Sequence, residues 1–393
     1  MSQRVTIAGV GITPFGKFLD RTVRNLSEEA VGNALSDAQI EPERIDRIFF
    51  GNAASGIVTG QEMVRAQAAL RFTGLAGKPM INVENACASG STAFHLAWQS
   101  VDSGQSDFAL VVGAEKLSHP DKAVSFGAFT KAVDLEEELP AYIGSGSGSI
   151  FMDIYAAKTR KYMDATGATG ADFAHITVKS RHAGARNPYA QFRKETTVEE
   201  VLASRMISEP LTLQMCSSIG DGAAAIVLCS HDAAARLGVS HPVWVPTSTL
   251  VSGYAVPDKP NAVSRAAAEA YEAAGIGPKD IHVAEVHDAA APAELLHYEN
   301  LQFCARGDGP KLLRSGDTEL GGKLSVNPSG GLLSRGHPIG ATGAAQIVEL
   351  VLQLRGQAGE RQRPGAKVAL AQNSGGQIGG DSAAAVCTLL VAN

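Results

Sequence analysis

Apolar positions recur at helical spacing in two segments of the chain, and a short apolar run follows each segment. One face of the first segment, residues 88–104, is apolar at i, i+3, i+4 and i+7: Phe94, Ala97, Trp98 and Val101. This spacing predicts a helix with one buried side. The second segment, residues 341–357, is apolar almost all around, which predicts a buried helix. The runs that follow, Phe108–Glu115 and Lys367–Gly376, have the length and composition of strands.

These segments belong to a longer internal resemblance between the two halves of the chain. Residues 30–54 and 266–290 each contain an alanine-rich helical pattern, a turn with proline and a short apolar run, and Pro42 aligns with Pro278. Alanine-rich helices resemble one another by chance, but the shared Ile-x-Pro-x-x-Ile turn favours a duplication. Two strand–helix halves predict an α/β protein with pseudo-twofold symmetry, paired sheets, and helices between or outside them.

The duplication divides the chain into two halves. We expect an N-terminal half over residues 1–240, which carries the nucleophile, and a C-terminal half over residues 241–393, which carries the histidine motifs. Residues 118–205 of the first half are rich in glycine and polar residues, which is typical of an inserted loop domain.

Composition restricts the functions open to the chain. It has 393 residues, of which 45% are hydrophobic and 19% charged, as in soluble globular proteins. Its formal net charge of −6 argues against nucleic acid as a partner, because phosphate backbones need a basic face. Its five cysteines are widely spaced and form no CxxC pair, so we expect neither a disulfide framework nor a metal site.

Targeting signals are the next feature to consider. The N-terminus shows no charged segment followed by a long apolar core, and no apolar run approaches the roughly 18 residues of a membrane helix. The C-terminal LLVAN is no peroxisomal tripeptide. Because unpaired cysteines also suit a reducing compartment, we expect a cytoplasmic protein with no membrane partner.

One cysteine stands where its surroundings favour reactivity. Cys87 lies in NACASGS, at the start of the first predicted helix. A thiol at a helix N-terminus experiences the positive end of the helix dipole, which favours the thiolate. Taken alone, a cysteine among alanines is more often a small buried packing residue, and Cys229 and Cys387 fit that description in their apolar runs. The sequence leaves Cys216 and Cys304 undecided.

Three further motifs carry groups that suit acyl chemistry. His337 lies in GHPIGATG, where Pro338 and the glycines fix the backbone, so its imidazole is suited to take a proton from a thiol or donate to an oxyanion. His287 and Asp288 end an apolar run in EVHDA, where a structural His–Asp pair is the alternative. Gly375 in NSGGQIGG offers a backbone N–H to an oxyanion, or forms an ordinary turn. All these motifs fall at strand ends or strand-to-helix turns, so we expect them to meet in one cleft.

Together the motifs resemble the thiolase superfamily over essentially the whole chain. NACASGS is similar to its nucleophile motif, CSSIGDGAAAIVL to its Ser-Gly-x-x-Asp-Gly-Ala strand, and GHPIGATG to its histidine motif. EVHDA and HAGARNPYAQF make the chain most similar to sterol-carrier-protein-type thiolases, in which a His-Asp motif replaces Asn-Glu-Ala-Phe. The resemblance implies a thiolase fold with its layers in the order αβαβα.

The resemblance also implies an acyl-CoA acyltransferase that forms or cleaves a 3-oxoacyl-CoA. Cys87 would take the acyl group from a coenzyme A thioester, activated by His337. His287 and His337 would flank one oxyanion pocket, and the N–H groups of Cys87 and Gly375 would form the other. No permanently bound cofactor or metal is implied, and coenzyme A enters as part of the substrate. A homodimer or homotetramer is expected, and relatives of the His-Asp type often work beside a small OB-fold partner.

The sequence departs from the family at the second catalytic cysteine, which handles the α-proton. Ala289 stands where sterol-carrier types carry this thiol, and Asn373 stands where many other thiolases carry it. Cys304 belongs to neither motif. His287 is a candidate substitute base; alternatively, the acceptor is an activated aromatic or another group that needs no deprotonation by the protein.

Candidate substrate-binding residues come from two regions. Basic residues gather in the predicted insert: Lys179, Arg181, Arg186, Arg193 and Lys194. Of these, Arg181 and Arg186 are the expected contacts to the phosphates of coenzyme A, although a solvated charged face explains the cluster at least as well. Ser329, Gly330 and Asp288, near the histidine motifs, are the other expected substrate contacts.

Three other functions stay open on sequence grounds. The first is acyl transfer to an acceptor other than coenzyme A. The second is an aldolase or lyase reaction on a thioester, as in some thiolase-like proteins, although those proteins use tyrosines near the motifs where this chain keeps Cys87 and His337. The third is a non-catalytic acyl-CoA carrier subunit, which the retained nucleophile and Gly-His-Pro argue against.

Overall fold

A single mixed sheet carries most of the strands. The computed structural model describes residues 5–138, 140, 143–144, 149–254, 256 and 259–392. The strands of this sheet are β1 (Val5–Ile12), β2 (Arg47–Gly51), β3 (Met80–Val83), β4 (Phe108–Glu115), β7 (Gly222–Ser230), β8 (Val243–Ser252), β9 (Val283–Glu285), β10 (Ser325–Val326), β11 (Val368–Gly375) and β12 (Ala384–Ala392). Their spatial order is β10-β9-β11-β12-β8-β1-β7-β4-β2-β3.

The sheet consists of two halves with the same topology. In one half β4, β2 and β3 are parallel, and β7 and β1 continue the sheet in antiparallel pairs. In the other, β11, β9 and β10 are parallel, and β12 and β8 continue in antiparallel pairs. Hydrogen-bonded pairing joins the two half-sheets where β1 pairs with β8, at Thr6–Trp244 and Ile7–Val243. The predicted duplication and fold class are therefore confirmed, with the paired sheets joined by this short contact.

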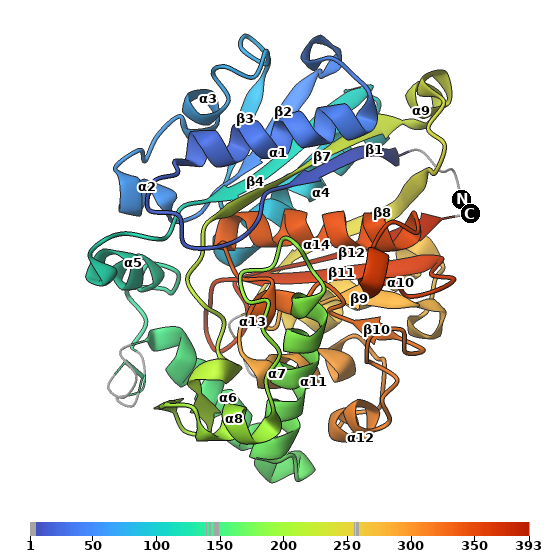
Figure 1. The fold of residues 1–393 in the computed structure, drawn as a ribbon. Helices are drawn as coiled ribbons and strands as arrows, with labels where there is room; N and C mark the ends of the chain where they lie inside the picture. Colours follow the sequence, from blue (N-terminus) through green and yellow to red (C-terminus); the bar gives the residue numbers. More distant parts are fainter. Residues whose placement is uncertain are drawn as a thin grey trace.

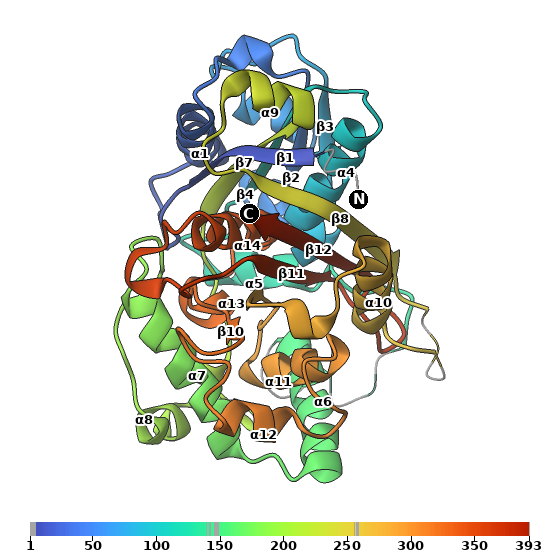
Figure 2. The same cartoon turned by 90° about the vertical axis from the view of Figure 1, so that its right-hand side faces the viewer.

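Helices form the layers around and between the two half-sheets. The helices are α1 (Val23–Ala38), α2 (Ser55–Thr59), α3 (Arg65–Ala69), α4 (Ser89–Asp102), α5 (Lys122–Phe129), α6 (Ile150–Thr166), α7 (Gly170–Ala185), α8 (Val198–Ala203), α9 (His231–Leu237), α10 (Ala262–Ala274), α11 (Ala291–Asn300), α12 (Gly309–Arg314), α13 (Gly331–Ser334) and α14 (Ile339–Leu354). Figures 1 and 2 show α4 and α14 between the half-sheets. Helix α1 packs on β1 and β7 outside one half, and α10 packs on β8 and β12 outside the other.

The helical residues between α5 and α8 fall within the predicted insert. They form one side of the molecule with the C-terminal half, because α6 and α7 both pack on α11 and α7 also packs on α13 (Figure 1). A small sheet of β5 (Met206–Ser208) and β6 (Leu211–Thr212) follows α8. None of the helices in the described ranges is both long and apolar enough to span a bilayer.

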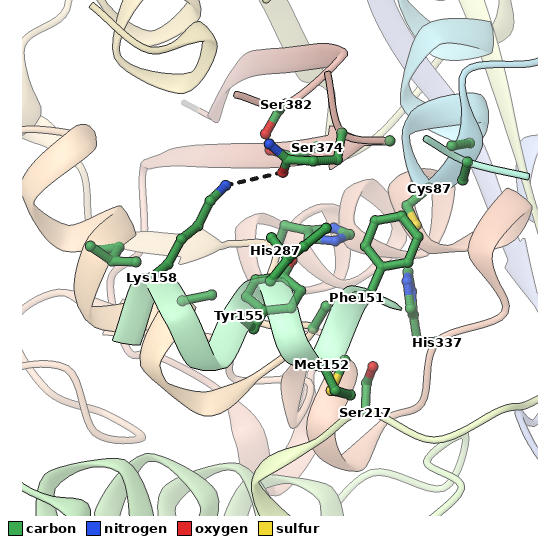
Figure 3. Close-up of a pocket in the computed structure, with 18 of the residues that line it drawn as sticks. Cys87, Phe151, Met152, Tyr155, Lys158, Ser217, His287, His337, Ser374 and Ser382 are labelled. Atoms are coloured by element: carbon green, nitrogen blue, oxygen red, sulfur yellow. Dashed lines mark hydrogen bonds between the residues drawn. The ribbon is translucent and has the colours of Figure 1, made fainter. Parts of the chain in front are cut away.

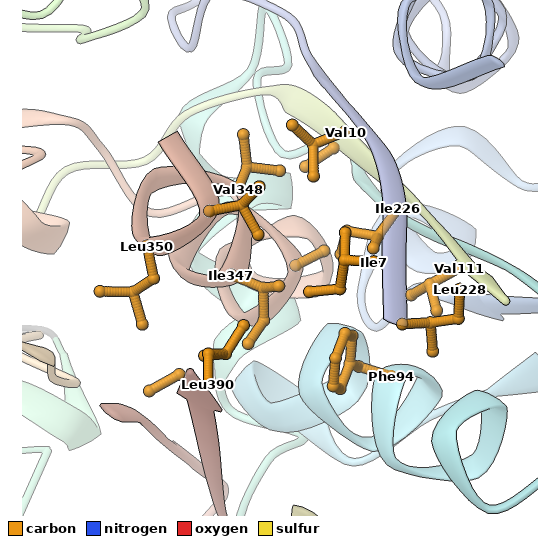
Figure 4. Close-up of a cluster of buried hydrophobic side chains, with 14 of the residues drawn as sticks. Ile7, Val10, Phe94, Val111, Ile226, Leu228, Ile347, Val348, Leu350 and Leu390 are labelled. Carbon is orange, nitrogen blue, oxygen red and sulfur yellow. The ribbon is translucent and has the colours of Figure 1, made fainter. Parts of the chain in front are cut away.

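The core between the half-sheets is built by the two helices that the apolar pattern predicts. Figure 4 shows Ile347 and Val348 of α14 and Phe94 of α4 beside side chains of the surrounding strands. Helix α14 is buried along nearly its whole length, which explains why it is apolar on almost every side. Glycine permits the closest contacts: a Cβ at Gly90 of α4 would lie 2.7 Å from the carbonyl oxygen of Gly340.

We expect Phe94→Ala to lower the free energy of unfolding by about 3–5 kcal/mol, because it removes an aromatic ring from a closely packed core. Phe94 is only 1% exposed. The urea unfolding midpoint, followed by tryptophan fluorescence, measures the change. Leu19→Ala is the matched control, since Leu19 is 64% exposed and its truncation leaves no cavity. Equal midpoints for the two variants would contradict this assignment of the core.

Candidate active site

A tight turn presents Cys87 at the start of α4. Ala86, Cys87 and Ala88 form the short 3₁₀ turn η2 (Ala86–Ala88), and α4 begins at the next residue. Ala86 has φ 48°, a left-handed conformation that a residue with a side chain adopts only under strain. Hydrogen bonds hold the turn, since Ser89 Oγ donates to Ala86 O (2.7 Å) and accepts from Asn85 N (2.9 Å). The thiol thus lies beside the helix N-terminus, as the sequence predicts.

Cys87, His287 and His337 form one cluster in the wall of a pocket. The Cys87 sulfur and one ring nitrogen of each histidine all lie within 4.8 Å of one another. The two imidazoles meet edge to face, with ring centroids 5.2 Å apart and an interplanar angle of 82°. Figure 3 shows these side chains facing the same space. One sulfur and two imidazole nitrogens so close together could also ligate a metal ion.

The hydrogen bonds of His337 fix its tautomer. Its Nδ1 lies 2.7 Å from Thr342 Oγ1, and that hydroxyl donates its single proton to Pro338 O at 3.0 Å. Thr342 therefore accepts from His337, which places the ring proton on Nδ1. The remaining nitrogen, Nε2, keeps its lone pair, so His337 is prepared to accept a proton.

The hydrogen bonds of His287 fix the opposite tautomer. Ser91 Oγ donates to Asn373 Oδ1 (3.0 Å), so the amide nitrogen of Asn373 faces His287 and donates to its Nδ1 (3.1 Å). Because Nδ1 accepts this bond, the ring proton of neutral His287 is on Nε2. His287 is therefore prepared to donate a hydrogen bond. Asn373, at the position of the missing thiol, has the role of orienting this histidine.

Burial keeps the reacting groups neutral in the resting protein. The pKa of Cys87 is raised to about 12 by burial and by the charge of Glu115, while the amides of Cys87 and Gly376 act in the opposite direction. Burial and the nearby Arg335 lower the pKa of His337 to about 3. Burial, followed by the two neighbouring histidines, lowers the pKa of His287 well below its usual value. At ordinary pH the Cys87 thiol is therefore protonated and the His337 imidazole beside it is neutral.

The backbone donor near the sulfur differs from the predicted one. The amides that favour the charged form of Cys87 are its own and that of Gly376, whereas Gly375 lies outside the pocket lining. Gly375 is the last residue of β11 and pairs with Ala384. Its lack of a side chain serves packing, since a Cβ there would lie 2.0 Å from Asn85 O. The NSGGQIGG turn therefore places a glycine amide near the Cys87 sulfur, that of Gly376, one residue after the predicted Gly375.

Glu115, at the end of β4, joins the turn that follows β2 to the start of α14. The sequence analysis did not identify it. Its fully buried carboxylate accepts hydrogen bonds from the amides of Ala53, Ala54, Ser55 and Gly340. The last of these belongs to the start of α14, three residues after His337. Four amide donors favour the charged carboxylate, although burial raises its pKa. A single acidic residue ending an apolar strand was the only signal in the sequence.

The pocket is a cavity of about 1500 Å³. Its apolar lining near the cluster includes aromatic side chains of α5 and α6: Phe126, Phe129, Phe151 and Tyr155. Basic residues from several segments also line it: Lys17, Lys131, Lys158, Lys161, Arg205, Lys259 and Arg306. A large pocket lined by aromatic and basic side chains fits an anionic ligand with an apolar portion.

The two arginines expected at the coenzyme A phosphates lie outside this lining. The guanidinium of Arg181 packs over the ring of Phe192, with 4.1 Å between its carbon and the ring centroid. Arg186 pairs with Glu195 at 2.9 Å. Neither side chain borders the pocket, so the structure does not bring them to the site. The sequence shows where charge accumulates, but not which way each side chain points.

Ser329, Gly330 and Asp288 form the support beneath the cluster and do not line the pocket either. Ser329 Oγ donates to Glu285 Oε2 (2.8 Å), and Gly330 has φ 96°. Asp288 Oδ1 accepts the Leu332 amide (2.7 Å). All three are fully buried or nearly so. These residues serve close packing beneath the cluster. In the sequence, such a motif resembles a ligand-binding motif.

The remaining cysteines do not restore the second thiol at the cluster. Ala289 lines the pocket but offers only a methyl group, and Asn373 carries an amide. Cys216 also lines the pocket, but its Sγ donates to Thr212 O (3.4 Å) and is not part of the Cys–His–His cluster. Cys304 lies outside the lining.

Comparison with known proteins agrees with this architecture. Residues 5–232 match the family model for the thiolase N-terminal domain, and residues 255–388 match the model described as thiolase C-terminal domain-like. Benzoylsuccinyl-CoA thiolase subunit BbsB of Thauera aromatica is 40% identical over 387 residues, which is 96% of each chain. Acetyl-CoA acetyltransferase of Methanothermobacter thermautotrophicus is 38% identical over 381 residues, 95% of this chain and 97% of that protein. Sterol carrier protein 2 of Bos taurus is 37% identical over 97% of this chain and 71% of its own length.

Solved structures share the same fold. The Ltp2-ChsH2(DUF35) aldolase structure superposes with a TM-score of 0.80 at 25% identity and covers 99% of this chain and 98% of that one. Human mitochondrial 3-ketoacyl-CoA thiolase has a TM-score of 0.71 at 20% identity and covers 99% of both chains. Because family models match both halves and relatives of 37–40% identity span nearly its whole length, the chain belongs to the thiolase family and is a thiolase-like acyltransferase.

Proposed function

We propose that this protein forms or cleaves a 3-oxoacyl-CoA by carrying the acyl group on Cys87. The observation that carries the proposal is the Cys87–His287–His337 cluster, whose three atoms lie within 4.8 Å in the wall of a large pocket. A nucleophile, a proton acceptor and a hydrogen-bond donor in one place are the groups that acyl transfer needs. A coenzyme A thioester is the substrate, and the reaction needs no resident metal or cofactor.

Acylation follows from the tautomers of the two histidines. His337 Nε2 takes the proton of Cys87 as its sulfur attacks the carbonyl carbon of the thioester. The oxyanion that forms lies near the amides of Cys87 and Gly376, which stabilise its charge. When the bond from carbon to the coenzyme A sulfur breaks, that sulfur recovers the proton from His337. The products are acyl-Cys87 and free coenzyme A, and His337 is neutral again.

The second half-reaction uses the same two histidines in different roles. His287 presents Nε2–H, so it donates to the carbonyl oxygen of the second acyl-CoA and stabilises its enolate. His337 has the free lone pair, so it takes the α-proton that the missing cysteine takes in other family members. The base is therefore His337, and not His287 as the sequence suggested. The enolate carbon then attacks acyl-Cys87, the carbon–sulfur bond breaks and the 3-oxoacyl-CoA leaves. The Cys87 thiolate so formed recovers the proton from His337, and both groups return to their neutral state.

The organisation of the protein completes the proposal. We divide the chain at residue 240 into the nucleophile half and the histidine half, with residues 118–205 as the insert that covers the pocket. The protein works in the cytoplasm as a homodimer or homotetramer. A small OB-fold protein is a candidate partner, supported by the similarity to the Ltp2-ChsH2(DUF35) aldolase, in which a DUF35 protein is present.

Intact-protein mass spectrometry after mixing with acetyl-CoA and longer acyl-CoAs tests the function. We expect a mass increase of one acyl group, which disappears when free coenzyme A is added. Cleavage of acetoacetyl-CoA, followed by absorbance in the same samples, reports the carbon–carbon step. Addition of EDTA is the control, because the cluster reacts without a metal and the chelator leaves both results unchanged.

Other outcomes distinguish the remaining functions. An adduct without cleavage of acetoacetyl-CoA, with or without an added OB-fold partner, indicates an acceptor other than coenzyme A. Cleavage of a β-hydroxy thioester to an aldehyde indicates a lyase of the aldolase type. The absence of an adduct with every donor contradicts covalent catalysis and leaves the carrier role.

A further inference from the structure

One lysine in the pocket wall has no anionic partner. Lys158 lies on α6, one turn beyond Tyr155, and its side chain is largely buried in the pocket lining. Its ammonium donates to Gln377 Oε1 at 3.0 Å, the dashed contact in Figure 3. No carboxylate oxygen of the described residues lies within 4.0 Å of it. A partly desolvated ammonium without a counter-ion is costly unless a ligand supplies the charge.

The side chain that Lys158 touches is also unsatisfied. Gln377 Nε2 is buried and has no acceptor among the described residues. An ammonium has three N–H groups and an amide nitrogen has two, so two N–H groups of Lys158 and both of Gln377 Nε2 have no acceptor among the described residues. Both residues line the pocket. A cluster of donors without acceptors is suited to an anion with two acceptor oxygens, such as a carboxylate.

The nearby acidic side chain is already occupied. Asp381 also lines the pocket, but its Oδ2 accepts the Ala262 amide at the start of α10 (2.9 Å) and its Oδ1 accepts the Ser382 amide (2.7 Å). Burial lowers the pKa of Lys158, the charge of Asp381 acts to raise it, and Lys161 acts to lower it. A second carboxylate bound by a ligand would raise that pKa and hold the ammonium charged.

The location of Lys158 relative to Cys87 identifies the portion of the substrate that would reach it. Figure 3 shows Tyr155 near the cluster and Lys158 farther along the same helix. The charge of Cys87 acts on Tyr155, whereas the charge of Lys158 acts on His297, which donates from Nε2 to His287 O (3.2 Å). Lys158 follows Tyr155 by three residues on α6, about 4.5 Å along the helix axis, so its backbone lies farther from the cluster than that of Tyr155. An acyl chain attached to Cys87 and directed along α6 therefore extends toward Lys158.

We propose that Lys158 and Gln377 form a carboxylate-binding subsite, so that the preferred acyl-CoA carries a second, free carboxylate on its acyl group. The inference rests on the proposed acyl transfer and specifies its substrate class. Lys158 is then a specificity residue, because it contacts the far end of the acyl chain and takes no part in bond formation. The apolar aromatic lining between the cluster and Lys158 contacts the methylene portion of the chain.

The test compares donors that differ only in the terminal carboxylate. Butyryl- and succinyl-CoA, pentanoyl- and glutaryl-CoA, and hexanoyl- and adipyl-CoA form three matched pairs. We expect the native protein to acylate Cys87 about 10- to 100-fold faster with the dicarboxylic member of at least one pair, the range that a hydrogen bond to a charged group gives. Lys158→Met should remove this preference and leave acylation by the neutral member within about threefold. Lys158→Arg should retain part of it.

Matched controls separate this inference from folding and from coenzyme A binding. Lys161→Met removes a neighbouring pocket-lining charge and should keep the preference. The inference is overturned if the native protein shows no preference in any pair, or if Lys158→Met slows both members equally, as it would if the ammonium held the coenzyme A phosphates. If no donor acylates Cys87, the proposed function fails instead. Calorimetric binding of glutaryl- and pentanoyl-CoA to Cys87→Ala then still compares the two ligands without acyl transfer.

Discussion

Cys87→Ala forms no acyl adduct with any acyl-CoA, and its turnover falls by about 10⁴-fold or more. The reason is that the acyl group has no other acceptor at the cluster. The remaining members, His287 and His337, carry no thiol and form no thioester. The measurement is intact mass after incubation with a donor, together with the rate of acetoacetyl-CoA cleavage. The variant should fold normally, since the side chain fills little space in the turn.

Cys216→Ala is the matched control for this result. Cys216 is the other thiol in the pocket lining, and burial raises its pKa to about 12, as for Cys87. Its sulfur donates to a backbone carbonyl and lies outside the cluster, so its loss should leave the adduct intact. An adduct that persists in Cys87→Ala and disappears in Cys216→Ala would contradict this assignment and identify Cys216 as the nucleophile.

His337→Asn lowers the rate of acylation by about 10²- to 10⁴-fold at neutral pH, because it removes the only free lone pair in the cluster. The adduct still forms slowly, since the nucleophile and its backbone donors are intact. Stopped-time mass spectrometry of the adduct measures the rate. His231→Asn, on the exposed side of α9, is the control and should match the native protein.

The pH dependence gives a sharper readout of the same variant. The pKa of His337 is about 3 and that of Cys87 is about 12, so at all ordinary pH values the imidazole is neutral and the thiol is protonated. The native acylation rate should therefore be nearly constant between about pH 5 and pH 9. In His337→Asn the reactive species is the thiolate formed by solvent, so its rate should rise about tenfold per pH unit over that range. A flat profile in the variant would exclude His337 as the proton acceptor.

Elements and motifs that depend on local pattern could be predicted from the sequence. The strand β4 (Phe108–Glu115) has the predicted bounds, and η1 (Pro42–Arg44) and η4 (Pro278–Asp280) are the paired turns that the repeat indicated. The period-3.6 apolar pattern identified α4, which buries one face, and the nearly continuous apolar composition identified α14, which is buried along nearly its whole length. The cluster of Cys87, His287 and His337 was also foreseen, since its motifs lie at strand ends that a duplicated α/β fold brings together.

The expected substrate contacts do not line the pocket, because a sequence does not show which way a side chain points. Arg181 and Arg186 were candidate phosphate contacts, yet one packs on an aromatic ring and the other pairs with a glutamate outside the pocket. Ser329 and Gly330 carry a distinctive motif that supports the site from beneath. The glycine amide beside the Cys87 sulfur is that of Gly376, because Gly375, the last residue of β11, still pairs with Ala384 of β12.

The sequence by itself determined the duplicated fold and the cysteine and two histidines that meet in the cluster, because each is encoded in a short contiguous pattern. The tertiary structure alone decided which histidine accepts and which donates, since Thr342 and Asn373 set their tautomers from 5 and 86 residues away. The tertiary structure also brought Lys158 to Gln377 in the pocket wall, although 219 residues separate them along the chain. Such groups become a site only when folding brings them within hydrogen-bond distance and removes the water that would otherwise satisfy them.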